Sequence, residues 1–305
     1  MLAIITHPDC LLHDNGPDHP ENAGRLNAIN DQLIMSGLES TLRFHDAPRV
    51  SAQQLRLAHD PEYIEKVLSF EGRPDDWKID PETVVSSDSV PAALRAAGAG
   101  ILGVDLTMKG DEGPIFCPVR PPGHHAERRG GMGFCIFNNV AVAACHALSE
   151  HSIERLAIAD FDAHHGNGTE DIFRNDPRVL LCSTFQHPFY PYTGEASDSP
   201  NLVNIPLAAG ADGTAFRAAV TQHWLPALAR FRPQFLLISA GFDGHSVDDM
   251  SGLELTDPDF TWVTEKLLDI ARKHAHGRLV SMLEGGYEPG QLGRSVVSHL
   301  KALLD

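Results

Sequence analysis

The chain has 305 residues, of which 42% are apolar and 21% are charged, and this composition excludes a largely disordered protein. Its 41 acidic residues outnumber its 24 lysines and arginines and give a formal net charge of -17, which would repel nucleic-acid phosphates and anionic membrane surfaces. We therefore expect a single catalytic domain over residues 1–305, with no direct binding to nucleic acids or membranes.

The amino-terminal residues contain no charged segment before a short apolar run, which argues against a secretory signal peptide. No later stretch approaches the roughly 18 uninterrupted apolar residues of a membrane span. The 5 cysteines lie at wide spacings without a C-x-x-C pair, so neither a disulfide framework nor a cysteine-rich zinc site is expected. These features predict a cytoplasmic protein with reduced thiols.

Short runs of apolar and β-branched residues recur along the chain and predict strands that are buried on both faces, as in a parallel sheet. Longer segments with a helical spacing of apolar residues lie between several of these runs. This alternation predicts an α/β fold with a central, mostly parallel sheet and helices on both sides. The predicted strands are residues 2–6, 114–117, 155–159, 179–183, 202–205, 235–239 and 279–283, and the predicted helices are residues 90–108, 138–150, 214–231 and 258–274.

Polar residues that directly follow predicted strands are candidates for a functional site, because ligands bind beyond the carboxyl ends of the strands in such sheets. Four segments meet this criterion. Residues 120–125 follow the second predicted strand, residues 160–165 the third, residues 241–243 the sixth and residues 284–287 the seventh.

Asp162 and His164 lie two residues apart after a predicted strand, so both side chains face the same way if the backbone stays extended. A single D-x-H pair is common in solvated loops, and the prediction therefore depends on a third ligand. Asp243, at the end of another strand, would complete the set. Two oxygens and one nitrogen suit zinc and leave a coordination position open, which is typical of a catalytic metal site.

His124 and His125 are adjacent in a turn bracketed by proline and glycine, where the loop geometry holds both rings. Beside a metal, one imidazole could move a proton between water and a leaving amine while the other stabilises charge. Asp160 and Asn167 are the candidate partners of the two rings. A charged partner raises the pKa of its histidine and a neutral amide does not, which would give the two rings unequal roles.

Tyr287 follows two glycines, Gly285 and Gly286, which allow a close backbone approach at the end of the seventh predicted strand. A phenol that faces a metal across a carbonyl group would stabilise the oxyanion of a tetrahedral intermediate. An isolated tyrosine of this kind more often packs by its ring and leaves its hydroxyl in solvent.

Taken in their order along the chain, these motifs resemble those of the histone deacetylase superfamily. The resemblance is closest to its class II and bacterial histone deacetylase-like amidohydrolase members. The resemblance extends over nearly the whole chain. It implies an arginase/deacetylase-type three-layer fold and a zinc-dependent hydrolase that converts acyl-lysine, or a related N-acylated amine, to the free amine and a carboxylate. It rests on His19-Pro20-Glu21 with Arg25, on residues 120–126, 133–139, 160–168 and 239–243, and on residues 284–287.

The resemblance also implies a role for each matching position, and it pairs His124 with Asp160 and His125 with Asn167. The implied zinc ligands are Asp162, His164 and Asp243. The implied catalytic residues are those around the metal: His124, His125, Asp160, Asn167 and Tyr287. The implied substrate-binding residues are those that match the acyl-lysine tunnel and its surroundings: Gly133, Phe134, Tyr190, Met250, Gly285 and Gly286.

One or two structural sites for a monovalent cation are implied as well, with potassium as the expected ion. Many of the ligands in such sites are backbone carbonyl oxygens, which a sequence does not display. The residues of the first site are Asp160, Asp162, His164, Ser183 and Thr184, and those of the second are Phe173, Asp176, Val179 and Phe216.

In the implied mechanism, zinc and His125 activate water, Tyr287 and zinc stabilise the oxyanion, and His125 protonates the departing amine. A binuclear manganese ureohydrolase of the same fold is a rival, but its D-A-H-x-D motif requires a carboxylate where this chain has Gly166. A catalytically inactive acyl-lysine-binding protein is a second rival. Such a protein is expected to have lost a metal ligand or the tyrosine, and all of these residues are present.

The sequence defines the substrate less closely than it defines the reaction. In polyamine deacetylases of this family, a glutamate that meets the substrate's distal ammonium lies seven residues beyond the third zinc ligand, and Met250 holds that position here. Because a thioether carries no charge, we expect an acylated lysine in a peptide or protein, or a small acylated amine, to be preferred to an acetylpolyamine. Asp248 or Asp249 could supply a negative charge from a shifted loop, which keeps an acetylpolyamine amidohydrolase as the alternative. The sequence does not fix the oligomeric state.

Overall fold

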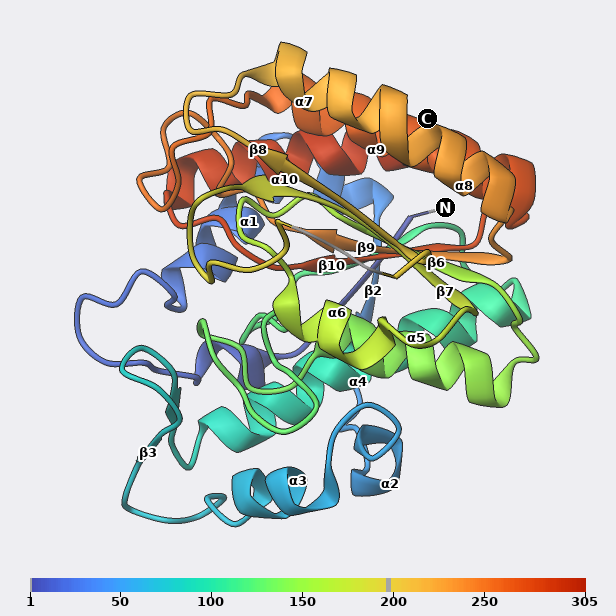
Figure 1. Ribbon diagram of the computed structural model, residues 1–305. Helices are drawn as coiled ribbons and strands as arrows, with labels where there is room; N and C mark the ends of the chain where they lie inside the picture. The colour runs from blue at the N-terminus through green and yellow to red at the C-terminus, as the bar shows by residue number, and fades with distance from the viewer. Residues whose placement is uncertain (1, 196–198) are drawn as a thin grey trace.

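The computed structural model describes residues 2–195 and 199–305, and within these residues eight strands form one sheet in the order β2-β1-β5-β10-β9-β6-β7-β8. Every neighbouring pair in this sheet is parallel. Helices cover both faces of the sheet (Figure 1), so the predicted α/β fold is confirmed. The strands of the sheet are β1 Ala3–Thr6, β2 Arg43–Asp46, β5 Ile115–Cys117, β6 Leu156–Asp160, β7 Val179–Gln186, β8 Leu202–Leu207, β9 Phe235–Ala240 and β10 Leu279–Leu283, and β3 Trp77–Lys78 pairs separately with β4 Val84–Val85.

All seven predicted strands are present, because their apolar runs supply side chains to both faces of the sheet. Strands β5, β6, β7, β9 and β10 are buried at every position. The sequence does not predict β2, since three of its four residues are polar and it lies at the sheet edge, where Phe44 is 49% exposed. An edge strand of this kind lacks the apolar run that marks a central strand.

Two helical layers enclose the sheet (Figure 1). Helices α4, α5 and α6 lie on one face, and α7, α8, α9 and α10 lie on the other, where α10 packs against α1 and α9. A π-helical turn at Val220–Trp224 interrupts the helix predicted over residues 214–231, and Pro226, which has no amide hydrogen, follows this turn. The helices are η1 Pro8–Leu11, α1 Gly24–Met35, η2 Leu38–Thr41, α2 Ala52–Leu55, α3 Pro61–Leu68, α4 Ser89–Lys109, α5 Asn139–Glu150, α6 Asn167–Phe173, α7 Gly213–Ala219, η3 Val220–Trp224, α8 Leu225–Phe231, α9 Asp257–His274 and α10 Pro289–Leu304.

Helix α4 is long and apolar enough to cross a membrane by length and composition alone, but 72% of its most apolar 18-residue window is buried inside the fold. Its glycines allow a close approach to the sheet. A Cβ atom at Gly100 would lie 2.9 Å from the sulfur of Met282 in β10, and one at Gly103 would lie 3.0 Å from Val280. This helix is therefore part of the core.

The strand order explains why the candidate segments meet. Strands β5, β10, β9 and β6 are consecutive neighbours in the sheet and are parallel, so their carboxyl ends lie along one edge. Each of the four candidate segments follows one of these strands. The fold thus gathers residues that are up to about 160 positions apart in the chain at the middle of one sheet edge.

Candidate active site

Three side chains with metal-binding atoms meet beyond the carboxyl ends of β6 and β9. The Nδ1 atom of His164 lies 2.9 Å from Oδ2 of Asp243 and 3.1 Å from Oδ1 of Asp162. One ligand atom from each residue lies within 4.8 Å of the other two, and all three residues are buried. The structure therefore brings together the three residues for which the sequence predicts a metal-binding role.

Backbone groups hold both carboxylates in place. Asp162 accepts a hydrogen bond from the N–H of Gly285 at 2.8 Å, and Asp243 accepts one from the N–H of Ala163 at 2.9 Å. A Cβ atom at Gly241 would overlap the Asp162 carboxylate, and one at Gly285 would overlap the carboxylates of both aspartates. Only glycine fits at these two positions without displacing the candidate ligands.

The charges of this group suit a divalent cation. Burial raises the pKa of Asp243 to about 6, and the neighbouring Asp162 carboxylate adds to this shift. Burial lowers the pKa of His164, but the carboxylates of Asp243 and Asp162 raise it to about 10. A divalent cation would favour ionised carboxylates and a neutral imidazole. One nitrogen and two oxygens are a donor set that zinc accepts, so these residues fit a zinc ion.

His124 and Asp160 form a buried pair beside the candidate ligands. The Nδ1 atom of His124 lies 3.0 Å from Oδ2 of Asp160, and its Nε2 atom lies 3.8 Å from Oδ1 of Asp162. Burial lowers the pKa of His124, but the carboxylates of Asp162 and Asp160 raise it well above its ordinary value. The carboxylate of Glu284 accepts the N–H groups of Gly123 and His124 at 2.7 and 3.1 Å and fixes the turn. His124 therefore favours its charged form.

His125 has a neutral partner. Its Nδ1 atom lies 2.8 Å from Oδ1 of Asn167. The Nδ2 atom of Asn167 donates to the carboxylate of Glu127 at 2.8 Å, which identifies the atom that faces His125 as the amide oxygen. Nδ1 of His125 is therefore the donor, and Nε2 keeps its lone pair. Burial and the charges of His124 and His164 lower the pKa of His125 well below its ordinary value.

A cavity of about 220 Å³ opens beside His125 and His164. The predicted substrate residues Gly285 and Gly286 lie outside its lining. The ring of Tyr190 meets the ring of His125 edge-on, with 5.3 Å between their centroids. The residues that line the cavity are Glu82, His125, Gly133, Phe134, His164, Phe189, Tyr190, Met250 and Tyr287.

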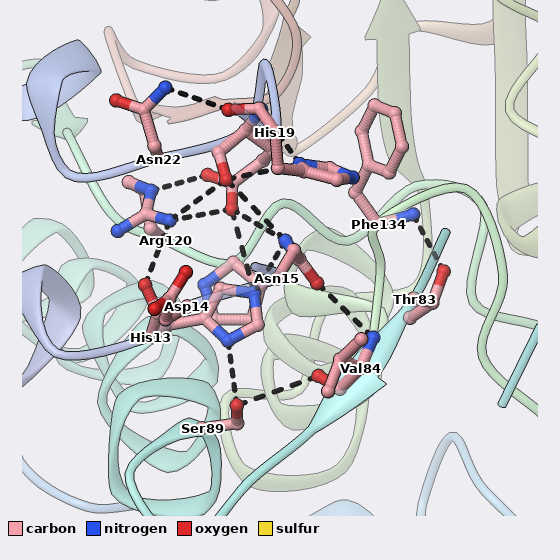
Figure 2. Close-up of polar contacts among 12 residues, drawn as sticks. His13, Asp14, Asn15, His19, Asn22, Thr83, Val84, Ser89, Arg120 and Phe134 are labelled. Carbon is pink, nitrogen blue, oxygen red and sulfur yellow. Dashed lines mark hydrogen bonds and ion pairs between the residues drawn. The ribbon is translucent and has the colours of Figure 1, made fainter. Parts of the chain in front are cut away.

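Gly133 and Phe134 form one wall of the cavity in a backbone conformation with φ angles of 54° and 68°. A Cβ atom at Gly133 would lie 2.6 Å from the ring of His125, so glycine is required there. The N–H of Phe134 donates to the hydroxyl of Thr83 at 2.9 Å (Figure 2), and the N–H of Gly133 donates to Asp80 at 3.2 Å. The segment that joins β3 to β4 therefore holds this wall.

Tyr287 is held by Arg25 and Asp248. The guanidinium carbon of Arg25 lies 4.8 Å from the centroid of the tyrosine ring, and its Nε atom donates to the carbonyl oxygen of Gly286 at 2.6 Å. The carboxylate of Asp248 accepts the N–H groups of Tyr287 and Met250 at 2.6 and 3.0 Å. Asp248 is only 6% exposed, so this carboxylate is committed to the backbone and does not supply a negative charge at the cavity opening.

A buried network connects the amino-terminal segment to the histidine turn (Figure 2). Glu21 is ion-paired with Arg120 and Arg25, and all three side chains are fully buried. Burial raises the pKa of Glu21, but the charges of Arg120 and His13 lower it to about 2. Arg120 also donates to the carbonyl oxygens of Cys10 and His13 at 3.0 and 3.1 Å. Because Arg120 begins the turn that carries the tandem histidines, this network fixes the position of that turn.

Sequence reasoning missed two residues of the cavity. Phe189 precedes the predicted Tyr190, and its ring lies 5.4 Å from the ring of His164. Glu82 is an exposed carboxylate in the β3–β4 segment. Nothing in the sequence pattern marks Glu82, since it lies in a polar segment away from the predicted strand ends.

The first predicted potassium site contains a buried hydroxyl group without a partner. Asp160 and Ser183 are aligned in register between β6 and β7, and both are fully buried. The Oγ atom of Ser183 has no hydrogen-bond partner among the residues that the structure describes. Thr184, which follows, is also buried. An unpaired buried hydroxyl beside a buried carboxylate fits a site that is completed by a cation.

The residues predicted for the second potassium site do not fit a cation. The Nδ2 atom of Asn201 lies at hydrogen-bonding distance from three of their carbonyl oxygens. The Oδ1 atom of Asn201 accepts from the hydroxyl of Ser199, so the nitrogen is the atom that faces the carbonyls. The carbonyl of Phe216, the fourth predicted residue, accepts the N–H of Val220 in the helix. The amide nitrogen of Asn201 lies 2.9, 3.1 and 2.9 Å from the carbonyl oxygens of Phe173, Asp176 and Val179.

Comparisons with known proteins place these features in a family. A family model described as the histone deacetylase domain matches residues 19–303, a range that includes every predicted site residue. The chain is 36% identical over 295 residues to a probable deacetylase of Archaeoglobus fulgidus, covering 94% of this chain and 81% of that protein. It is 34% identical over 298 residues to a histone deacetylase-like amidohydrolase of Pseudomonas aeruginosa, covering 94% and 77%. The crystal structure of the HDA15 HD domain matches with a TM-score of 0.94 at 31% identity, over 99% of this chain and 88% of that chain.

Proposed function

This chain belongs to the histone deacetylase family, and we propose that it is a zinc-dependent deacylase that hydrolyses the amide bond of an acyl-lysine or a related N-acylated amine. The products are the free amine and a carboxylate. The relatives named above include a probable deacetylase and an amidohydrolase. The observation that carries the proposal is the convergence of Asp162, His164 and Asp243, of which His164 lines the same cavity as His125.

Asp162, His164 and Asp243 would hold the zinc ion. When bound, zinc supplies a Lewis acid that polarises the amide carbonyl and lowers the pKa of water. The protein contributes ligands whose orientation is already fixed, because backbone N–H groups hold both carboxylates. The open cavity beside His164 leaves room for a substrate at the same position.

His125 is the proposed general base and acid. Because its Nδ1 atom donates to Asn167, its Nε2 atom is able to accept a proton from the attacking water. The same atom returns the proton to the amine nitrogen as the C–N bond breaks. His124, which its carboxylate partner Asp160 holds in the charged form, stabilises the negative charge that develops nearby.

Tyr287 is the proposed donor to the oxyanion. Burial raises the pKa of its phenol well above the ordinary value, so the hydroxyl keeps its proton and is able to donate. Arg25 and Asp248 restrain the ring and the backbone of this residue. The donor is therefore oriented before the substrate binds, which is the condition for efficient stabilisation of a developing charge.

An acylated lysine in a peptide or protein is the proposed substrate class. The cavity has a volume of about 220 Å³ and is lined by Gly133, Phe134 and Tyr190, which favours an unbranched chain. Met250 contributes an uncharged thioether to the lining. The net charge of -17 favours a basic peptide or protein as the partner.

A second candidate, an acetylpolyamine, is favoured by one observation. Glu82 places a carboxylate in the lining of the cavity, where it would attract the distal ammonium of such a substrate. The same carboxylate would equally attract a basic residue next to the acyl-lysine of a peptide. Glu82 therefore keeps both classes open, although Met250 replaces the charged residue at the expected position.

The test is turnover of a panel of acyl-lysine peptides and acylated polyamines by protein whose zinc content is measured. We expect amine release in proportion to bound zinc. Asp243→Ala should be inactive, whereas Asp269→Ala, which removes an exposed carboxylate on α9 outside the candidate ligands, should remain active. Absence of amine release by zinc-loaded protein, or full activity in Asp243→Ala, would overturn the proposal.

A further inference from the structure

A second cluster of metal-binding side chains lies between α4 and α5. The Nε2 atoms of His146 and His151 lie 2.7 and 2.6 Å from the same oxygen, Oδ1 of Asp105. Asp105 belongs to α4 and His146 to α5, and His151 directly follows α5. We propose that these three residues form a second metal site that binds a first-row divalent cation such as zinc.

The cluster is separate from the proposed active site. Helix α5 begins just after the cavity wall and runs back to the start of β6, and α4 ends shortly before the start of β5. Asp105 and His151 therefore lie near the edge where the strands begin, whereas Asp162 and Asp243 follow the carboxyl ends of the strands. An ion at one site does not share ligands with the other.

The donor set matches the chemistry of borderline cations. Two imidazole nitrogens and one carboxylate oxygen suit zinc, cobalt or nickel better than calcium or magnesium. One ligand atom from each of the three residues lies within 4.8 Å of the other two. Ligand atoms in a tetrahedral zinc site lie roughly 3.3 Å apart, so the two rings would move away from the carboxylate by roughly 0.6 Å.

The surroundings combine a rigid support with access from solvent. Helices α4 and α5 pack along each other, and the side chain of His146 is only 7% exposed. The side chains of Asp105 and His151 are 32% and 20% exposed, so an ion reaches them without an opening of the fold. His146 also borders a surface cavity of about 350 Å³ together with Glu150.

One feature favours a cation over a purely hydrogen-bonded cluster. His151 is the C-cap residue of α5, where the partial negative charge of the helix end attracts cations. The Nδ1 atom of His146 is buried and has no hydrogen-bond partner in the described part of the chain. In the hydrogen-bonded cluster the carboxylate of Asp105 accepts from Nε2 of His146, and a bound cation would take the Nε2 lone pair and require the ring proton to move to Nδ1.

A bound ion would connect α4 to the end of α5 and stabilise the helical layer. Because the folded chain would bind the ion and the unfolded chain would not hold the three ligands together, added metal should raise the unfolding temperature. The alternative is that Asp105 accepts hydrogen bonds from two neutral imidazoles and binds no metal. The two cases differ in metal stoichiometry.

The experiment adds zinc, or cobalt as a coloured probe, to full-length protein that already carries its active-site metal. Calorimetry and equilibrium dialysis should detect one further equivalent per wild-type chain, and the unfolding temperature should rise with the free metal concentration. His151→Ala and Asp105→Asn should each weaken this second event by at least about tenfold. His223→Ala is the matched control, since it removes an exposed histidine on another helix.

Amide hydrolysis by the variants checks that they are folded and retain the first metal. His151→Ala changes a partly exposed residue after the helix, so it tests the site even if Asp105→Asn disturbs the packing of α4. The proposal is overturned if wild-type protein binds no further equivalent. It is also overturned if both cluster variants bind that equivalent as tightly as His223→Ala does.

Discussion

Nδ1 of His125 donates a hydrogen bond to Oδ1 of Asn167 across 2.8 Å, and this bond fixes the tautomer of the ring. The proton lies on the side of the amide, and the other nitrogen keeps its lone pair. Its neighbour His124 faces the carboxylate of Asp160 instead and favours the charged form. Two adjacent residues of the same type therefore have different electrostatic roles.

His125→Ala should reduce kcat/KM more than His124→Ala does, because it removes the nitrogen that moves the proton. We expect a loss of about 10²–10⁴-fold for His125→Ala, the usual contribution of a general acid–base group. Steady-state kinetics on one acetyl-lysine peptide, with His223→Ala as a control outside the site, measures both losses. A larger loss in His124→Ala would reverse the assignment.

Tyr287→Phe removes one hydroxyl group and leaves the ring under Arg25. We expect kcat to fall by roughly 10²–10³-fold, the usual loss for one oxyanion donor, while KM and zinc content stay near their wild-type values. Kinetics combined with metal analysis separates these effects. If Tyr287→Phe turns over at nearly the wild-type rate, the phenol has no part in the mechanism.

Removal of the proposed active-site metal should abolish hydrolysis. Dialysis against a chelator is expected to inactivate the protein, and about one equivalent of zinc or cobalt should restore activity. Asp243→Ala should lose the active-site metal and the activity, because it removes one of three protein ligands. Asp269→Ala should lose neither. Two metal ions held tightly at Asp162, His164 and Asp243 would contradict a mononuclear site.

The substrate preference depends on Met250 and Glu82, which both line the cavity. We expect kcat/KM for an acyl-lysine peptide to exceed that for acetylated putrescine or spermidine by about tenfold, or roughly 1.4 kcal/mol. Met250→Glu should lower the ratio of these two kcat/KM values, because the added carboxylate would attract the distal ammonium of the polyamine. The turnover of acetylpolyamines by Glu82→Gln shows whether the native carboxylate binds these substrates. If the wild-type chain hydrolyses acetylpolyamines faster than the peptide, acetylpolyamines are the substrate class instead.

Acid should destabilise the chain through His299. This residue is fully buried, with its ring nitrogens 2.6 and 2.9 Å from the hydroxyl groups of Thr264 and Ser281. Burial lowers the pKa of His299 from 6.5 to about 3 in the folded state. The unfolded chain therefore binds the proton first as the pH falls, so the stabilisation is present above about pH 6.5 and is lost toward about pH 3.

The expected loss from His299 is about 2 kcal/mol of unfolding free energy between roughly pH 7 and pH 5. Chemical denaturation across this range should give a flatter pH dependence for His299→Gln than for wild type. Release of zinc in acid affects both proteins equally, so the difference between the two curves isolates the histidine. His223→Gln, at an exposed position, should follow the wild-type slope.

The strands and the strand-end motifs were predictable because burial on both faces requires an uninterrupted apolar run, and a parallel sheet puts its ligands at the carboxyl ends. Asp162, His164 and Asp243 could be grouped on this basis alone. The edge strand β2 could not be predicted, since one face of an edge strand tolerates polar residues such as Arg43 and His45.

Contacts between distant segments were not predictable from local patterns. Glu82 reaches the cavity through the β3–β4 segment, whose position depends on its bonds to Gly133 and Phe134. Asp248, whose position in the sequence allows a charge at the substrate, instead binds backbone N–H groups with its carboxylate. The approach of the Asn201 amide to three carbonyl oxygens likewise depends on carbonyl directions, which a sequence does not contain.

The glycines beside the metal-binding carboxylates have a consequence for how related sequences are interpreted. A side chain at Gly241 or Gly285 would overlap Asp162, and at Gly285 also Asp243. A homologous chain could therefore retain each ligand, both histidines and the tyrosine, and still be inactive because one methyl group displaces a carboxylate. Assignment of activity from reactive residues alone would classify such a chain as an enzyme. The absence of a side chain at Gly241 and Gly285 is therefore as diagnostic of a functional site as the residues that perform the chemistry.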